Sequence, residues 1–120
     1  MHQSRLGSIV IDCDDLKAGV AFWSAVLGLE EGDRDGNYVD LRGNIGGLRI
    51  LLQKVPEKKT AKSRIHLDIE TDDVDAEVKR LEALGARRRE RPVMEDPCGN
   101  EFCVISPETE GFPERARTWD

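Results

Sequence analysis

The feature that most constrains the fold of this chain is an internal repetition. A short alternating apolar run, then acidic residues, then a helical pattern occurs first as IVIDCDDLKA from Ile9 and again as IHLDIETDDVDA from Ile65. Each copy closes on a Leu-Gly pair, Leu27–Gly28 and Leu84–Gly85, and the offset is 56 residues between the isoleucines and 57 between the glycines. Two copies at this spacing predict one duplicated supersecondary unit, because a solenoid needs three or more.

A chain of 120 residues is near the common size of one domain, so we expect a single domain over residues 1–120. Each half of the pattern is typical of a βαβββ module, which makes the predicted fold α+β. The expected organisation is module one at 5–55, a polar linker at 56–62, module two at 63–106 and a polar tail at 107–120, which Phe112 and Trp119 could anchor.

Alternation and turn residues place the individual elements. The expected strands are 6–13, 38–42 and 48–54 in the first module, and 64–70, 86–89, 92–95 and 101–105 in the second. One helix is expected to begin after Asp14 or Asp15 and to end at Gly28, and the other to begin after Asp73 and to end at Gly85. Asp33 to Gly36 and Asp96 to Asn100 have the composition of turns.

Charge and cysteine content exclude several classes of partner. The formal charge of −6 disfavours non-specific binding to nucleic acid. The run Arg87–Arg91 is therefore interpreted as a solvated strand edge, not as a nucleic-acid patch. No apolar stretch reaches the length of a membrane span, and no secretory signal opens the chain, so no membrane partner is expected. Three cysteines without such a signal favour reduced thiols and a cytoplasmic location.

Three longer stretches carry a resemblance to a known superfamily. DDLKAGVAFWSAVLGLE, RIHLDIETDDVDAEVKRLEALGA and DPCGNEFCVI resemble the vicinal oxygen chelate superfamily, which includes glyoxalase I, extradiol dioxygenases and the fosfomycin- and bleomycin-resistance proteins. The chain is most similar to the bacterial glyoxalase-like subgroup. The resemblance implies two βαβββ modules whose strands curl into a cup, a ligand pocket within that cup, and a homodimer.

The same resemblance bears on a metal cofactor. Members that depend on a metal place single His or Glu ligands on four strands. The corresponding positions here are Ser8, Leu52 (or Gln53 after a one-residue slip), Arg64 and Cys103. Leucine offers no donor, and an arginine cannot ligate and would repel a divalent cation. The sequence therefore predicts that the superfamily's metal is absent and that no cofactor is bound.

Strand alternation supplies a candidate ligand site. If Ile65, Leu67 and Ile69 pack on the helices, the intervening polar side chains point into the cup. A carboxylate two residues from an imidazole can orient it, and an arginine can hold an anion through two hydrogen bonds. The candidate ligand-binding residues are Arg64, His66, Asp68, Asp12, Gln53, Cys103 and Ser8. The same set could instead form a satisfied structural network, or carry out acid/base chemistry.

The sequence as a whole predicts a cytoplasmic glyoxalase-like protein that binds a small molecule in the cup of its sheet, without the superfamily's metal. One alternative is a metal-dependent lyase or dioxygenase with relocated ligands. The other is a drug-binding resistance protein of the bleomycin-resistance type, for which a net charge of −6 would suit a cationic drug. Whether the protein is an enzyme, and what its ligand is, stay open at this stage.

Overall fold

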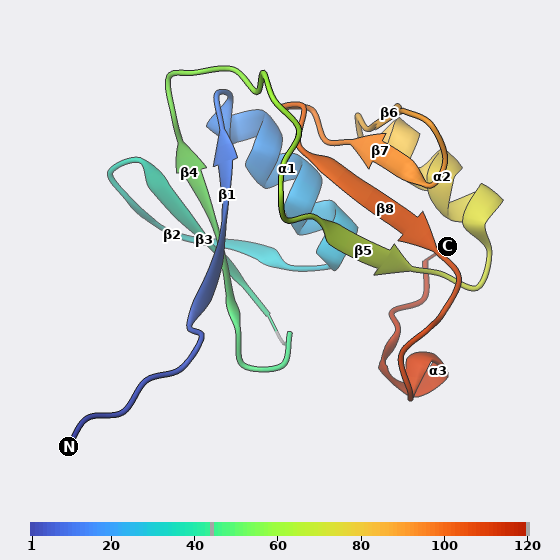
Figure 1. Ribbon diagram of the computed structural model, residues 1–120, viewed down its shortest axis with the longest axis horizontal. Helices are drawn as coiled ribbons and strands as arrows, with labels where there is room; N and C mark the ends of the chain where they lie inside the picture. The colour runs from blue at the N-terminus through green and yellow to red at the C-terminus, as the bar shows by residue number, and fades with distance from the viewer. Residues whose placement is uncertain (44, 120) are drawn as a thin grey trace. The chain divides into compact units, whose positions relative to one another are not determined.

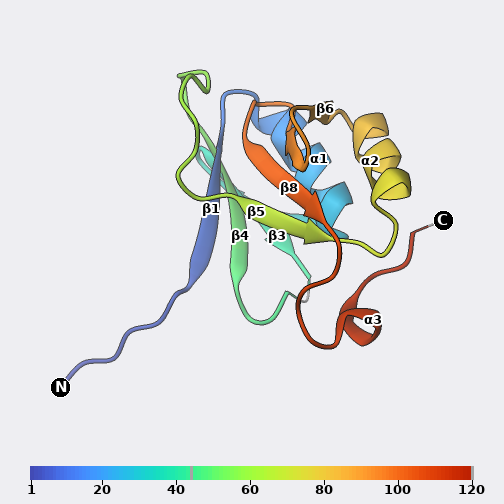
Figure 2. The same ribbon diagram turned by 45° about the vertical axis from the view of Figure 1, so that its right-hand side comes forward.

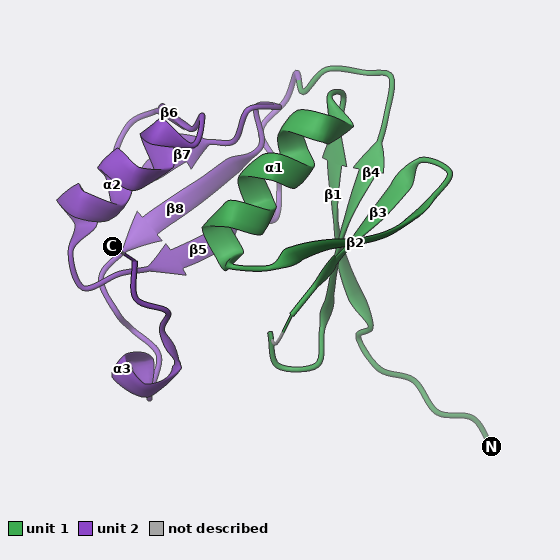
Figure 3. Cartoon of the chain, turned by 180° about the vertical axis from the view of Figure 1, so that it is seen from behind, with its two compact units in different colours: residues 1–59 green, residues 60–120 purple. Residues whose placement is uncertain are grey.

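A computed structural model describes residues 1–43 and 45–119 of the chain (Figure 1). The chain divides into two compact units, Met1–Lys59 and Thr60–Asp120 (Figure 3). The division falls within the linker expected at 56–62. Each unit contains the order βαβββ, so the duplicated unit and the α+β class predicted from the sequence are confirmed. The strands form two four-stranded mixed sheets, and neither sheet closes on itself within the described residues.

The first unit is a sheet with strand order β1-β4-β3-β2 and one helix. β1 (Ser8–Cys13) runs parallel to β4 (Arg49–Lys54), and β3 (Tyr38–Arg42) is antiparallel to both β4 and β2 (Glu30–Asp35). Burial alternates along β3 and β4, as expected for a sheet covered on one face. The buried side chains of this unit are Cys13, Leu16, Val20, Phe22, Trp23, Val26, Leu29, Val39, Leu41, Ile50 and Leu52.

The helix of the first unit, α1 (Leu16–Leu27), begins and ends where the sequence predicts. Asp15 is the N-cap, and its carboxylate accepts a hydrogen bond from the Ala18 N–H at 3.1 Å. Gly28 ends the helix in the left-handed conformation, with φ 67°. Within the helix Gly19 lies so close to β1 that a Cβ added there would stand 2.4 Å from Cys13 Sγ. The missing side chain is what allows α1 to pack this tightly on the sheet.

The strand β2 corrects one prediction. Asp33–Gly36 was expected to be a turn, but Asp33 to Asp35 belong to β2, and the turn lies at Gly36 and Asn37. β2 is an edge strand with almost no buried side chain, and its register shifts between Glu31 and Arg34. A charged edge strand carries no alternating apolar signal, so the sequence pattern does not reveal it.

The second unit repeats the arrangement with strand order β5-β8-β7-β6. β5 (Leu67–Glu70) runs parallel to β8 (Glu101–Ile105), while β7 (Val93–Glu95) is antiparallel to β8 and to β6 (Arg87–Arg88). The helix α2 (Val74–Ala83) is capped by the Asp73 carboxylate, which accepts from the Ala76 N–H at 3.0 Å, and it contacts β8. The buried apolar side chains are Val78, Leu81, Ala86, Met94, Cys98, Phe102 and Val104.

Strand β5 is shorter than predicted, and this changes two expectations. It begins at Leu67, so Arg64 and His66, expected within a strand at 64–70, precede it. Ile65, expected to pack against a helix, is 85% exposed. Residues 64 and 65 form a bend, where period-two alternation no longer determines the direction of a side chain. The other predicted strands agree with the structure to within one or two residues at their ends.

The arginine run at 87–91 is neutralised within its own unit. Arg88 pairs with Glu82 at 2.9 Å, and Arg91 pairs with Asp75 at 2.7 Å. Arg87 and Arg89 both approach Glu95. These exposed pairs contribute little stability each, but they place a carboxylate beside the guanidinium groups.

Among the described residues, no helix combines the length and the apolar character that crossing a membrane requires.

Candidate functional site

The candidate site of the second unit lies on one face of its sheet, which is defined by the burial of β8. Phe102 and Val104 are buried together with Val78 and Leu81 of α2, whereas Cys103, between them, is only half-buried. Successive side chains of a strand point to opposite faces, so Cys103 points away from α2. We call this side of the β5-β8-β7-β6 sheet its open face.

The register of the sheet brings Asp68 to the same place. Cys103 of β8 has a direct partner on each side: Asp68 of β5 across the parallel pair, and Val93 of β7 across the antiparallel pair. Directly paired residues present their side chains on the same face, so Asp68 and Cys103 share the open face. The burial of Phe102 and Val104 on β8 therefore places Cys103, and with it the paired carboxylate of Asp68, on the open face.

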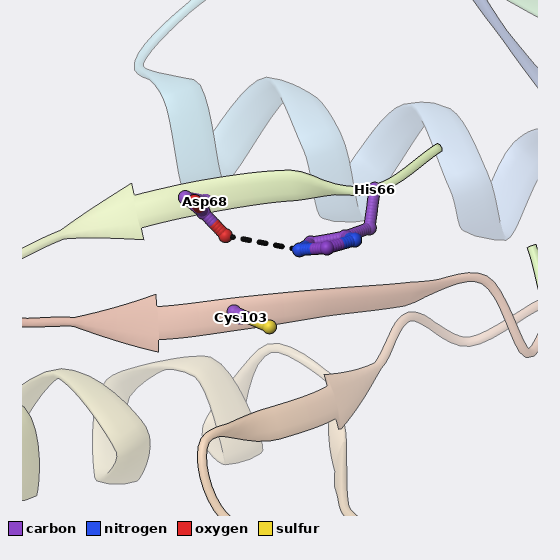
Figure 4. A group of neighbouring side chains, drawn as sticks. All are labelled: His66, Asp68 and Cys103. Carbon is purple, nitrogen blue, oxygen red and sulfur yellow. Dashed lines mark ion pairs between the residues drawn. The ribbon is translucent and has the colours of Figure 1, made fainter. Parts of the chain in front are cut away.

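His66 completes the group from outside the strand. Its Nε2 lies 3.3 Å from Asp68 Oδ1, and the two side chains are 48% and 49% exposed (Figure 4). One donor atom from each of His66, Asp68 and Cys103 lies within 4.8 Å of the others. An imidazole held through one ring nitrogen by a carboxylate keeps its other nitrogen available to a ligand. We call these three residues the His66 cluster.

The environment of Cys103 keeps its thiol protonated. Partial burial raises the pKa of Cys103 above its ordinary value of 9.0, and the negative charge of Asp68 raises it further. The positive charge of Lys62 opposes this effect, and a hydrogen bond to Asp68 adds to it. A neutral thiol is a poor nucleophile, so this cysteine is placed to contact a ligand and not to attack one.

The remaining predicted residues belong to the first unit or to the bend before β5. Asp12 and Gln53 are direct partners across β1 and β4, and Ser8 is paired with Arg49 at the other end of β1, all in the first unit. Arg64 is exposed in the bend before β5. Within the second unit the structure brings together the three residues of the His66 cluster, and within the first unit it brings together Asp12 and Gln53. The expectation that Arg64, His66 and Asp68 face one cavity, with Asp12 and Gln53 nearby, stays a prediction.

Sequence reasoning missed Glu70 and Lys62. Glu70 follows Asp68 by two residues on β5, so the alternation that selected Asp68 also places Glu70 on the open face. Lys62 lies in the stretch that the sequence indicates as a linker, and its charge reaches Cys103. The signal for Glu70 was present in the period-two pattern, whereas nothing in the sequence pattern indicates Lys62.

The positions that hold the superfamily's metal do not suit one here. Leu52 is fully buried and lies against α1, with its Cδ1 3.7 Å from the Cβ position of Gly19. Gln53, the next residue, is half-buried on the opposite face of β4. Ser8 and Arg64 supply neither a carboxylate nor an imidazole. Of the four positions, only Cys103 is part of a group of donors: with His66 and Asp68 it places sulfur, imidazole and carboxylate donors close together.

Comparisons with known proteins agree with this architecture. A family model described as a glyoxalase-like domain matches residues 8–105. No curated protein sequence matches the chain. Similar solved structures include a glyoxalase/bleomycin resistance protein/dioxygenase family enzyme from Burkholderia phytofirmans, with 22% identity over 84% of this chain and 97% of the other and a TM-score of 0.68.

Two further structures are similar to the same extent. A glyoxalase/bleomycin resistance protein from Albidiferax ferrireducens has 18% identity over 84% of this chain and 98% of the other, with a TM-score of 0.63. A possible glyoxalase from Bacillus cereus has 21% identity over 85% of this chain and 98% of the other, also with a TM-score of 0.63. At these identities the structures support the fold alone.

Proposed function

The chain belongs to the glyoxalase-like domain family, and from this premise we propose that it binds a small molecule on the open face of its second sheet, without the metal of the wider vicinal oxygen chelate superfamily. The observation that carries the proposal is the His66 cluster, three polar side chains held together on the sheet face that α2 does not cover. The fold supplies a rigid platform, and the cluster supplies the polar groups that orient a ligand.

The geometry favours a small ligand that has both hydrogen-bonding and apolar parts. Asp68 can accept hydrogen bonds, and the imidazole of His66 can donate or accept them. Cys103 and Val93, which are paired across β8 and β7, form the less polar surface beside these two groups. A few polar groups beside apolar ones are typical of sites that bind small molecules.

The test is a ligand screen with matched variants. A fragment library that includes organic acids, amines and cationic antibiotics is screened against the 15N-labelled protein, and binding is followed by changes in amide chemical shift. We expect at least one compound to shift the amides of residues 66–68 and 103, and His66→Ala or Asp68→Asn to weaken its binding. His2→Ala, the same change at the other histidine of the chain, should leave binding unchanged. Compounds that bind equally well to His66→Ala would contradict the proposal.

A second candidate function, metal-dependent chemistry, is favoured by one observation, the proximity of the three donor atoms of the His66 cluster. These residues would hold a borderline cation such as Zn²⁺, whose bound form supplies Lewis-acid chemistry. Cys103 would then have to lose its proton, which its raised pKa opposes. Calorimetric titration with Zn²⁺ and with Ni²⁺ separates the two functions. Stoichiometric binding that is lost in His66→Ala and retained in His2→Ala would overturn the metal-free proposal.

We further propose that the protein works as a homodimer in the cytoplasm. The homodimer is supported by the limited core that a chain of 120 residues can build. The cytoplasmic location is supported by three cysteines, none of which forms a disulfide. Light scattering at micromolar concentration tests the homodimer, and a monomeric mass would contradict it. Cell fractionation tests the cytoplasmic location.

A further inference from the structure

The chain after β8 is fastened to the second unit at two separate places. The N–H groups of Glu108 and Thr109 donate to Glu70 Oε2 at 2.7 and 2.8 Å, and the Thr109 hydroxyl donates to Glu70 Oε1 at 2.5 Å. The chain then turns through α3 (Phe112–Arg115), and the ring of Trp119 lies against Arg80, whose Cζ is 3.9 Å from the ring centroid. We call residues 106–119 the strap.

The first attachment lies beside the candidate site. Glu70 and Asp68 are two residues apart on β5, so their side chains share the open face, with Cα atoms about 7 Å apart. Ile105 is the partner of Glu70 across the parallel pair, just as Cys103 is the partner of Asp68. The strap is therefore fastened one row of side chains from the His66 cluster, towards the carboxyl ends of β5 and β8.

The second attachment holds the strap to the helix side of the same sheet. Arg80 of α2 donates to both carboxylate oxygens of the buried Glu77, at 2.7 and 3.0 Å, which fixes the guanidinium. A guanidinium over an indole ring is a favourable contact. In Figures 1 and 2 the strap leaves the end of β8, turns at α3 and returns towards α2. The strap is therefore attached to the second unit near both of its ends.

We propose that the strap is a wall of the ligand site, and that Glu70 is the positioning residue that sets this wall. The inference rests on the proposed function and deepens it. A ligand in contact with His66 and Asp68 meets residues 108 and 109 when it extends along β5 towards Glu70. The site therefore accepts compact ligands that approach from the His66 end, and it rejects ligands that extend past Asp68 towards the carboxyl end of the strand.

Cys103 allows this wall to be measured without a known ligand. Its thiol lies in the cluster and is less buried than those of Cys13 and Cys98, which serve as internal controls. The full-length protein is treated in parallel with a small reagent, iodoacetamide, and a bulky one, N-(1-pyrenyl)maleimide, and modification of each cysteine is followed by peptide mass spectrometry. In both reactions the thiolate is the nucleophile: it displaces iodide from iodoacetamide, or adds to the double bond of the maleimide. The ratio of the two rates at Cys103 therefore reports access, independently of the pKa of the thiol.

The variants release the strap at either end. Glu70→Met removes the acceptor while keeping the length of the side chain, Thr109→Val removes one donor, and Trp119→Ala removes the far attachment. We expect each to raise the rate of the bulky reagent several-fold relative to iodoacetamide, because a strap held at one end opens more often. Glu70→Gln, which keeps an acceptor oxygen, should give a smaller change. Glu82→Met, which removes a carboxylate paired with Arg88 on the surface of the same unit, is the matched control and should leave the ratio unchanged.

The outcomes separate this inference from the proposed function. An unchanged ratio in both Glu70→Met and Trp119→Ala, with Cys13 and Cys98 still protected, would overturn the wall while leaving ligand binding intact. A raised ratio in a protein for which the screen finds no ligand dependent on His66 would uphold the wall and overturn the binding proposal. Labelling of Cys13 or Cys98 identifies a variant that has lost its fold, and the milder Thr109→Val then decides the question.

Discussion

The two modules place different chemistry at the same position of the same fold. Asp12 of β1 and Asp68 of β5 occupy equivalent places in the repeated pattern, and each has a direct partner on the neighbouring parallel strand, Gln53 in one case and Cys103 in the other. Two residues earlier, the first module has Val10, which is 46% exposed, whereas the second has His66. Both units therefore have a carboxylate at this place on the strand, but only the second has an imidazole two residues before it.

The helices of the two modules differ in a related way. Four residues after the N-cap, α1 has Gly19, which lets the helix approach Cys13 closely, and α2 has Glu77, a buried carboxylate paired with Arg80. The first helix is held by close apolar packing. The second carries a charged pair within the helix, between Glu77 and Arg80, and Arg80 also contacts Trp119 of the strap. Close packing joins α1 to its sheet, whereas the charged pair connects α2 to the segment that Glu70 holds beside the candidate site.

The largest expected effect tests whether β8 has two functionally distinct faces. Phe102→Ala should reduce the free energy of unfolding by about 3–5 kcal/mol, because Phe102 is fully buried and its removal leaves a cavity. Cys103→Ala, one residue along the strand, should cost less than about 1 kcal/mol, because the thiol lies on the open face. Urea denaturation followed by circular dichroism measures both. Equal losses would mean that the open face is part of the core.

The next effect concerns the close packing of α1. Gly19→Ala should destabilise by about 1–3 kcal/mol despite the better helix propensity of alanine, because the new methyl group collides with the buried Cys13 thiol. The double variant Gly19→Ala with Cys13→Ala should recover part of the loss. Gly7→Ala is the control, since nothing lies within 4 Å of the Cβ position of Gly7. A stabilised Gly19→Ala protein, measured by urea denaturation, would show that Cys13 can move aside.

The N-caps offer a comparison in which the modules should behave alike. Asp15→Ala and Asp73→Ala each remove a carboxylate that accepts from an N–H three residues on, at 3.1 and 3.0 Å. Each should cost about 0.5–2 kcal/mol in free energy of unfolding, and the two costs should be similar. Asp14→Ala and Asp72→Ala, the neighbouring acidic residues, should cost less. Thermal unfolding monitored by circular dichroism checks the four variants, and a clear difference between the two caps would show that the repeat is equivalent in sequence only.

Much of the fold could be predicted because its signals are local and periodic. The caps at Asp15 and Asp73, the glycine after α1 and the alternation along β8 each determine their own element. The edge strand β2 could not be predicted, since charged residues on an exposed edge have no apolar period. The bend at residues 64 and 65 was missed because the alternation in IHLDIE starts at Ile65, two residues before the strand begins at Leu67.

The candidate site was predictable only in part. Alternation identified Asp68 and Cys103, and the structure adds their register. His66 reaches Asp68 from outside the strand, so its place in the cluster depends on the bend and not on the pattern that suggested it. Trp119 was expected to anchor the tail, and it lies against Arg80. The attachment to Glu70 could not be predicted, since it joins Glu70 to Glu108 and Thr109, which lie 38 and 39 positions further along the chain. Contacts of this kind depend on tertiary structure, which local patterns do not specify.

The smallest expected effect is a local one, at the attachment of the strap. Hydrogen bonds from Thr109 and Glu108 lower the pKa of Glu70 below its ordinary value of 4.5. A carboxyl group whose folded pKa is depressed contributes stability that is fully present above its unfolded pKa and is lost as the pH falls through its folded pKa. We therefore expect the strap to stay attached at neutral pH and to loosen below pH 4.5, with little change in the stability of the sheets.

The amide proton shifts of Glu108 and Thr109, followed by NMR from pH 7 to pH 3, should report a common titration below 4.5 that disappears in Glu70→Gln. The first unit has no counterpart of this attachment among its described residues, so the β1 amides should show no such dependence on Glu70. Amide shifts of Glu108 and Thr109 that titrate identically in the wild type and in Glu70→Gln would show that another group holds the strap.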